Sequence, residues 1–208
     1  MPFAPHATPA PPPPLAGAQI AARCKRAKLV GTPAQPPLLE GPADVNTAGF
    51  VIHGAIHNDF PQWKVVFHAH VPEALAVTAL KDGFQHLVQD TSMLYGDIGY
   101  HDWEGLSLTL EERERLAENM QGKRALIMRN HGFLTVGETA GEAFMVMHYL
   151  IRGCRALLAA AGSGLELDPG PKEIWELSKR QYDHFPLGQY EWPALVRLCE
   201  RLDPGFKQ

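Results

Sequence analysis

The sequence predicts a folded domain of the α/β class, in which short strands alternate with helices along the chain. Residues 65–71 place alternate side chains on two faces, and one face is wholly apolar, as in a strand that packs on a core. Apolar runs of strand length occupy 124–128 and 133–136. Over 140–161, apolar residues recur at the i, i+3, i+4 spacing, which predicts a long helix packed on the strands.

Capping and stop signals place the helices. Thr139 and Glu142 have the spacing of a capping box at the start of the longest helix. Thr109 and Glu112 have the same spacing and predict an exposed, charged helix. Pro72 suits the first turn of a helix that follows the first strand. The predicted helices are 46–58, 72–80, 109–121, 140–161, 171–183 and 193–202.

The two helices nearest the C-terminus carry apolar residues at helical spacing, which predicts one buried face on each. The positions that we expect to be buried are Ile174, Leu177, Leu195, Leu198 and Leu202. In the longest helix, the same reasoning predicts that Cys154 is a core thiol, whereas His148 lies off the apolar stripe and is exposed.

Length and composition limit the class of protein. The chain has 208 residues, 45% hydrophobic and 20% charged, which is enough for one domain with a complete core. A net charge of −4 gives no electrostatic reason to expect nucleic acid or an anionic membrane as a partner. The sequence contains neither a membrane-spanning apolar stretch nor the pattern of a secretory signal at its start. Three widely spaced cysteines fit reduced thiols, so we expect a cytoplasmic protein.

Residues 1–43 differ in composition from the rest of the chain, because they hold eleven of the eighteen prolines. Such a stretch favours extended, solvated conformers and forms neither a normal helix nor a central strand. We expect a poorly ordered tail or linker over 1–43 and a folded domain over 44–208. Recognition of the prolines by a partner module is the alternative interpretation.

Histidines on the first strand and in a later turn predict a metal site. His68 and His70 share the polar face of the strand, about 7 Å apart at their Cα atoms, and two neutral imidazoles there can bind one divalent cation. A third imidazole, His131, lies in an Asn-His-Gly turn between two apolar runs. His53 and His57 also share a helix face, but they lack the glutamate of a His-Glu-x-x-His motif. We interpret that pair as polar packing beside a cleft.

Residues 44–206 resemble the class II aldolase/adducin family. The resemblance rests on short motifs at 45–53 (VNTAGFVIH), 66–70 (VFHAH), 94–96 (LYG), 100–105 (YHDWEG), 129–132 (RNHG) and 191–195 (EWPAL). It implies a three-layer α/β/α sandwich with a mixed, largely antiparallel central sheet, assembled as a homo-oligomer with fourfold symmetry. It also implies that His68, His70 and His131 are the metal ligands.

Two features depart from the family pattern. In sugar-phosphate aldolases of this family a glutamate precedes the first histidine of the His-x-His motif by nineteen residues. Here that position is Gly49, as in the adducin-like branch. The family also has amino-terminal strands and a phosphate-binding loop, which residues 1–43 do not match. Both departures argue against a phosphorylated sugar as the substrate.

The predicted chemistry follows from the metal site. Three neutral histidines leave an open position on a bound ion, which is typical of catalysis; zinc is the default ion, and manganese, cobalt or iron also fit. We predict a lyase for a small-molecule substrate, performing aldol cleavage or decarboxylation of a hydroxy/keto or carboxylate compound through a metal-stabilised enediolate. The candidate proton donors are Tyr100, Tyr95, Asp102 and Glu73. The alternative is a non-catalytic, adducin-like interaction domain or an inactive truncated relative.

Overall fold

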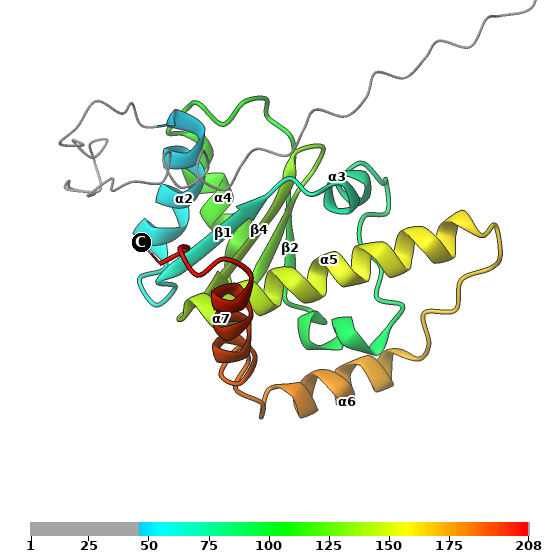
Figure 1. Cartoon of the computed structure of the whole chain (residues 1–208). Coiled ribbons are helices and arrows are strands. Elements are labelled where there is room, and N and C mark those ends of the chain that lie inside the picture. The colour runs from blue at the N-terminus through cyan, green and yellow to red at the C-terminus, as the bar shows by residue number, and fades with distance from the viewer. Residues whose placement is uncertain (1–45, 208) are drawn as a thin grey trace, which may run out of the picture.

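The computed structural model describes residues 46–207 (Figure 1). The predicted tail lies outside the described residues, so its boundary with the domain stays a prediction. The helices are α2 (Thr47–Asp59), α3 (Pro72–Thr78), α4 (Glu112–Met120), α5 (Ala140–Gly162), α6 (Lys172–Tyr182) and α7 (Glu191–Leu202), with the 3-10 helix η1 (Gln89–Leu94). The strands are β1 (Val65–Ala69), β2 (Ile98–His101), β3 (Ala125–Met128) and β4 (Gly132–Gly137). All the predicted helices and strands in this part of the chain are present.

The four strands form one mixed sheet in the order β1-β4-β3-β2. β4 pairs antiparallel with β1 on one side and with β3 on the other, whereas β2 and β3 run parallel. β3 and β4 are the two apolar runs of the sequence, joined by the turn that carries His131. The predicted mixed, largely antiparallel sheet is therefore confirmed.

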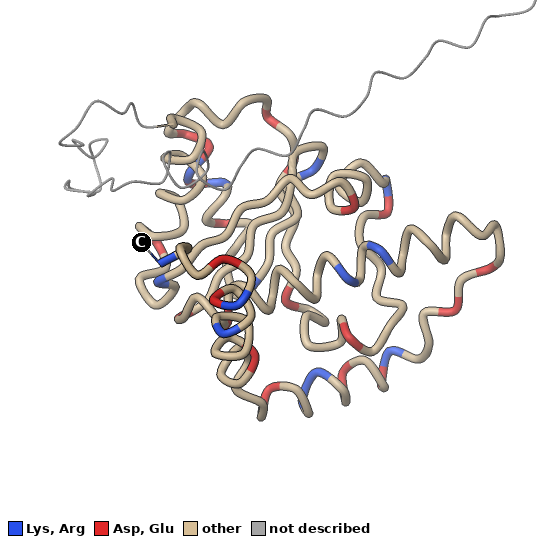
Figure 2. The backbone as a smooth tube through the Cα atoms, in the orientation of Figure 1, with Lys and Arg blue, Asp and Glu red and all other residues tan. Residues whose placement is uncertain are grey.

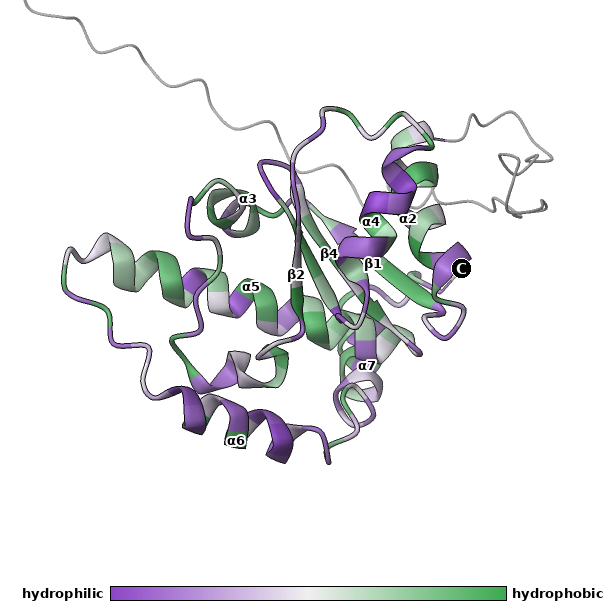
Figure 3. Cartoon of the chain, turned by 180° about the vertical axis from the view of Figure 1, so that it is seen from behind, coloured by the Kyte–Doolittle hydropathy of each residue, from purple (hydrophilic) through white to green (hydrophobic). Residues whose placement is uncertain are grey.

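Helices cover both faces of this sheet (Figures 1 and 3). On one face α2 packs against α4, and Ile56 and Leu116 meet Leu134 of β4 in one core cluster. On the other face lie α3 and α5, where Leu150 meets Phe133 of β4 in a second cluster. Each side chain buried in this way contributes about 1.5–3 kcal/mol. The two clusters and the sheet between them make the predicted three-layer α/β/α sandwich.

α5 is long and apolar enough to cross a membrane by length and composition alone. In this fold it lies along the sheet, with Val146 and Leu150 fully buried, so it is a core helix. Thr139 caps its start by accepting a hydrogen bond from the backbone N–H of Glu142 at 3.1 Å, as predicted. Cys154 is fully buried, which confirms the predicted core thiol, and this burial raises its pKa to about 12.

The capping box predicted at Thr109 and Glu112 does not form. α4 begins at Glu112, and no side chain caps its first turn. Glu112 is only 4% exposed, and its Oε1 accepts a hydrogen bond from Ser107 Oγ at 2.8 Å. The Glu112 carboxylate therefore lies in the protein interior, where it accepts a hydrogen bond from the buried Ser107 hydroxyl. The prediction of a wholly exposed, charged helix is wrong at this residue.

The C-terminal helices differ most from the prediction. α6 lies beside η1 and α7 lies beside α5, but most of the residues expected to be buried on them are exposed. The exposed positions are Ile174 (57%), Leu177 (43%), Leu198 (40%) and Leu202 (76%), whereas Leu195 is half-buried. Helical spacing places apolar residues on one face but does not determine whether another element covers that face.

Candidate metal centre

The polar site of the sheet is made by histidines rather than by charged side chains. None of the four strands contains Lys, Arg, Asp or Glu, and the charged residues lie on the surrounding helices and loops (Figure 2). His68 lies in β1 on the same face as Val66, which packs in the α2/α4 cluster. His70 follows the end of β1, and His131 lies in the β3–β4 turn.

Antiparallel pairing brings the three histidines together, although they are far apart in the sequence. Ala69 pairs with Phe133 at the end of the β1–β4 ladder. The chain just beyond Ala69 therefore lies beside the turn that precedes Phe133. A strand that ends next to a hairpin turn presents its last side chains to the side chains of that turn, and here these include the imidazoles of His68, His70 and His131.

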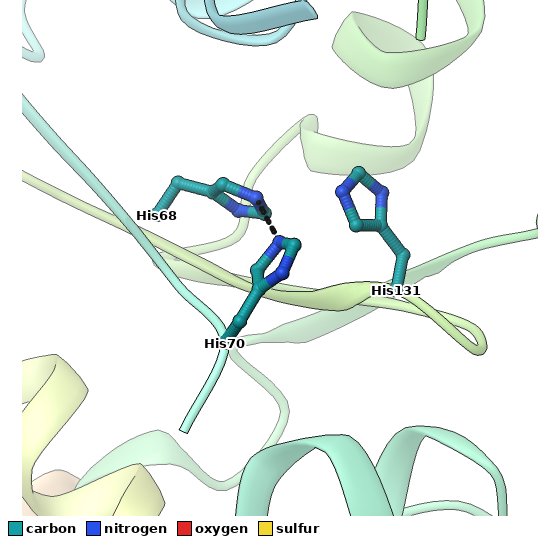
Figure 4. A group of neighbouring side chains, drawn as sticks. All are labelled: His68, His70 and His131. Carbon is teal, nitrogen blue, oxygen red and sulfur yellow. Dashed lines mark hydrogen bonds between the residues drawn. The ribbon is translucent and has the colours of Figure 1, made fainter. Parts of the chain in front are cut away.

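The three rings point toward one another (Figure 4). The ring centroids of His68 and His70 are 4.6 Å apart, and those of His131 lie 5.0 Å and 4.9 Å from the other two. One nitrogen from each ring lies within 4.8 Å of the others. The closest contact joins His68 Nε2 and His70 Nε2 at 2.7 Å. The structure therefore brings together all three predicted ligands.

The backbone fixes which nitrogen of His68 is free. Its Nδ1 lies 3.0 Å from the carbonyl oxygen of Phe133, which can only accept a hydrogen bond, so Nδ1 carries the proton. The lone pair is then on Nε2, the atom that faces His70. Such a bond to the second ring nitrogen is how proteins orient metal-binding histidines.

The donor set fits a single divalent ion. Zn–N bonds of about 2.0–2.1 Å at a tetrahedral angle put two ligating nitrogens about 3.3 Å apart. The observed separations, from 2.7 Å to no more than 4.8 Å, bracket that value. Three imidazoles from two rigid elements would leave at least one coordination position open to a substrate.

The environment of His68 and His131 favours their neutral form. Burial, followed by the nearby His131 and His70, lowers the pKa of His68 to about 4, against the weaker opposite effect of the Phe133 carbonyl. Burial and then His70 also lower the pKa of His131. A neutral imidazole is the form that binds a metal, so both rings are ready ligands at neutral pH.

The Asn-His-Gly sequence of the turn has a geometric cause. Asn130 has a φ of 55°, in the left-handed region that asparagine tolerates better than most residues. At Gly132, an added Cβ would lie 2.8 Å from both the Ala69 carbonyl oxygen and Cδ2 of His70. The turn therefore needs these two residues in order to hold His131 against the end of β1.

The two predicted tyrosines are committed elsewhere. The hydroxyl of Tyr100 accepts a hydrogen bond from the backbone N–H of Phe84 at 3.0 Å, and its ring packs with the cluster on the α5 face. Tyr95 packs against His86 and Trp175, with ring centroids 5.3 Å and 6.1 Å away. None of these contacts involves His68, His70 or His131, so a proton-transfer role for either tyrosine stays a prediction.

The two predicted carboxylates differ in their positions. Glu73, at the start of α3, forms an ion pair with Arg155 of α5 at 2.9 Å, on the far face of the sheet from α2 and α4. Asp102 follows β2, is 91% exposed at its side chain, and lies 3.5 Å from Arg129. Arg129 lies two residues before His131, so this ion pair connects Asp102 to the turn that carries His131.

Two polar positions near the site were missed as functional residues. His101 ends β2 with 2% of its surface exposed, and Glu112 is nearly as buried. Both act on His131, because Glu112 raises and His101 lowers its pKa, against the larger effects of burial and His70. His101 belongs to the motif at 100–105, but nothing in that motif predicts a buried partner on α4.

The predicted pair His53 and His57 divides between two environments. His53 of α2 lowers the pKa of His68, although several other groups contribute more. His57 bonds the Trp63 carbonyl.

The chain belongs to the class II aldolase and adducin family. The family model described as "Class II Aldolase and Adducin N-terminal domain" matches residues 21–158. The match begins before residue 44, where the sequence alone predicted the start of the domain. Family membership agrees with the sandwich fold and with the motifs around the three histidines.

Named relatives cover several kinds of protein. A putative aldolase class 2 protein of Caulobacter vibrioides is 34% identical over 168 residues, which are 79% of this chain and 65% of that protein. Alpha-adducin of Mus musculus is also 34% identical, over 76% of this chain but only 23% of its own length. The decarboxylase NovR of Streptomyces niveus is 31% identical over 81% of this chain and 62% of its own. The chain thus spans about two thirds or less of these relatives.

A solved structure has the same fold. The crystal structure of an aldolase II superfamily protein from Pseudomonas syringae superposes with a TM-score of 0.76 and 34% sequence identity. The superposition covers 82% of this chain and 69% of the Pseudomonas syringae chain. The α/β/α arrangement is therefore that of the aldolase II superfamily.

Proposed function

We propose that this chain is a metal-dependent lyase of the aldolase or decarboxylase type, with His68, His70 and His131 as the ligands. The observation that supports this most directly is the convergence of the three rings, together with the lone pair of His68 Nε2 turned toward His70. We propose zinc as the ion, with manganese, cobalt and iron(II) as alternatives for the same ligands.

A bound divalent cation would polarise a substrate carbonyl and stabilise the enediolate charge that aldol cleavage or decarboxylation develops. The chain itself supplies orientation, because the Phe133 carbonyl holds the His68 ring and the β3–β4 turn holds His131. Gly49 offers no proton-transferring group. Of the predicted donors, Asp102 is the one we favour, since it is exposed and beside Arg129.

The wider proposal concerns substrate, assembly and location. We propose a small hydroxy/keto or carboxylate compound as the substrate, with NovR as the relative whose name supports decarboxylation. The exposed apolar residues of α6 and α7 favour a homo-oligomer, a tetramer in the family pattern. The absence of a nucleic-acid or membrane partner and a cytoplasmic location are part of the proposal.

The second candidate is a non-catalytic, adducin-like interaction domain. The presence of Gly49 where the aldolases have a glutamate favours it, as does the similarity to alpha-adducin. Against it stands the cluster itself, since a scaffold has no chemical need for three imidazoles aimed at one point. The two candidates make opposite predictions about metal content.

Elemental analysis of the purified full chain distinguishes these candidates. We expect about one metal ion per chain, lost in His68→Ala and in His131→Ala but retained in His184→Ala, a matched control at an exposed histidine on another surface. Circular dichroism checks that each variant is folded. A folded wild-type chain that binds none of the four metals at micromolar concentration would contradict the proposal and favour the interaction domain.

A further inference from the structure

Three polar side chains are almost completely buried between β2 and α4. Ser107 is 1% exposed, His101 is 2% exposed and Glu112 is 4% exposed. Ser107 Oγ donates to Glu112 Oε1 at 2.8 Å, and Asn119 Nδ2 donates to His101 Nδ1 at 3.0 Å. Since Nδ1 accepts this bond, the proton of the neutral ring is on Nε2, which lies 3.4 Å from Glu112 Oε1.

Within the described residues, the only basic group beside the Glu112 carboxylate is the His101 ring. In residues 46–207, no Lys or Arg nitrogen lies within 4 Å of it. The two arginines of its own helix bond other groups: Arg113 bonds the Phe50 carbonyl and Arg115 bonds Glu104. In the part of the chain that the structure describes, His101 Nε2 also has no hydrogen-bond partner. A buried carboxylate without a cation is costly, so natural proteins keep one where a positive charge is present.

His101, the neighbour of this carboxylate, lies beside the strand that leads into the turn of His131. His101 pairs with Met128 across β2 and β3, and its carbonyl oxygen accepts a hydrogen bond from the Arg129 N–H at 2.8 Å. The His131 N–H in turn bonds the Met128 carbonyl at 3.1 Å. The His101–Glu112 pair is thus connected to the His131 turn through the backbone, and both groups act on the pKa of His131.

A three-histidine site leaves the full double charge of its ion uncompensated. In the aldolase pattern a carboxylate stands at the position of Gly49, which here cannot supply a negative charge. We propose that Glu112, held in place by Ser107 and lying beside His101, is the counter-charge for a divalent cation bound by His68, His70 and His131. Glu112 is then a positioning residue that sets metal affinity without being a ligand, an inference that rests on the proposed function.

The test replaces the charge and keeps the shape. Glu112→Gln retains an acceptor for Ser107, and Glu114→Gln removes one exposed carboxylate from the same helix as the matched control. Zinc affinity is measured by competition with a chromophoric chelator, and cobalt(II) absorption reports the ligand geometry. We expect Glu112→Gln to bind zinc about 10- to 100-fold more weakly with an unchanged cobalt spectrum, and Glu114→Gln to match wild type.

The stability of the metal-free variant separates a counter-charge from a structural role. If the Glu112 charge is uncompensated in the metal-free protein, its removal costs no stability, so metal-free Glu112→Gln melts at or above the wild-type temperature. A variant that is unfolded without metal, or that binds zinc as tightly as wild type, overturns the inference. If wild type itself binds no metal, the proposed function fails as well, so the two failures are distinguishable.

Discussion

The two faces of the sheet carry out different tasks. On the α5 face the core is apolar, and the buried hydroxyl of Thr135 is satisfied by a hydrogen bond to the Ala143 carbonyl at 3.0 Å. On the α2/α4 face the core ends in polar groups: within the described residues, His101 Nε2 has no hydrogen-bond partner, and Glu112 has His101 but no Lys or Arg beside it. Unsatisfied buried polar atoms also occur beside α5, at Arg124 Nε and Glu191 Oε2, so they do not distinguish the faces. The difference is the cluster of three imidazoles, and we therefore place function on the α2/α4 face and stability on the α5 face.

Leu150→Ala tests the stabilising face and has the largest expected effect. Leu150 is fully buried between α5 and the sheet, so its truncation leaves a cavity and lowers the free energy of unfolding by about 2–5 kcal/mol. Urea unfolding measures this change, with exposed Leu165→Ala as the control. Zinc affinity of the folded variant should equal that of wild type. A parallel loss of zinc affinity would show that the two faces are not independent.

Acid pH tests both faces, because each has a partly buried histidine whose pKa is lowered. Burial is the main cause that lowers the pKa of His68 and of His86 to about 4, from 6.5 in the unfolded chain. As the pH falls, the unfolded chain takes up these protons first. The contribution of these two histidines to the free energy of unfolding of the metal-free protein is therefore at its maximum above about pH 6.5, and it decreases progressively toward pH 4.

Variants separate the two contributions to this acid sensitivity. His86 packs against Thr91 and Trp175, away from the three imidazoles, so His86→Asn should flatten the pH dependence of unfolding without changing zinc affinity. Zinc release should follow the protonation of the ligands over the same range in wild type and in this variant. Denaturant unfolding at a series of pH values measures the first effect. An unchanged slope in His86→Asn would show that its ring does not titrate as the burial indicates.

The sequence predicted what depends on local pattern. The period of 65–71, the two apolar runs and the Asn-His-Gly turn placed the three histidines on elements that do meet. It failed where a partner from elsewhere decides the outcome. Glu112 matched a capping box but bonds Ser107, and the hydroxyl of Tyr100 is committed to Phe84 across a loop. No spacing rule reveals such contacts, because they depend on how α4 and β2 pack in three dimensions.

The exposed apolar residues of α6 and α7 were the other failure, and they give the smallest expected effect on stability. Leu202 is 76% exposed, so Leu202→Ser should change the unfolding free energy of a dissociated chain by no more than about 0.5 kcal/mol. In a homo-oligomer that covers α7, the same change weakens association, which light scattering over a concentration series measures. Arg201→Ser, at the neighbouring exposed position, is the control. A wild-type chain that stays monomeric at high concentration would remove the oligomer from the proposal and leave this apolar face without a partner of its own kind.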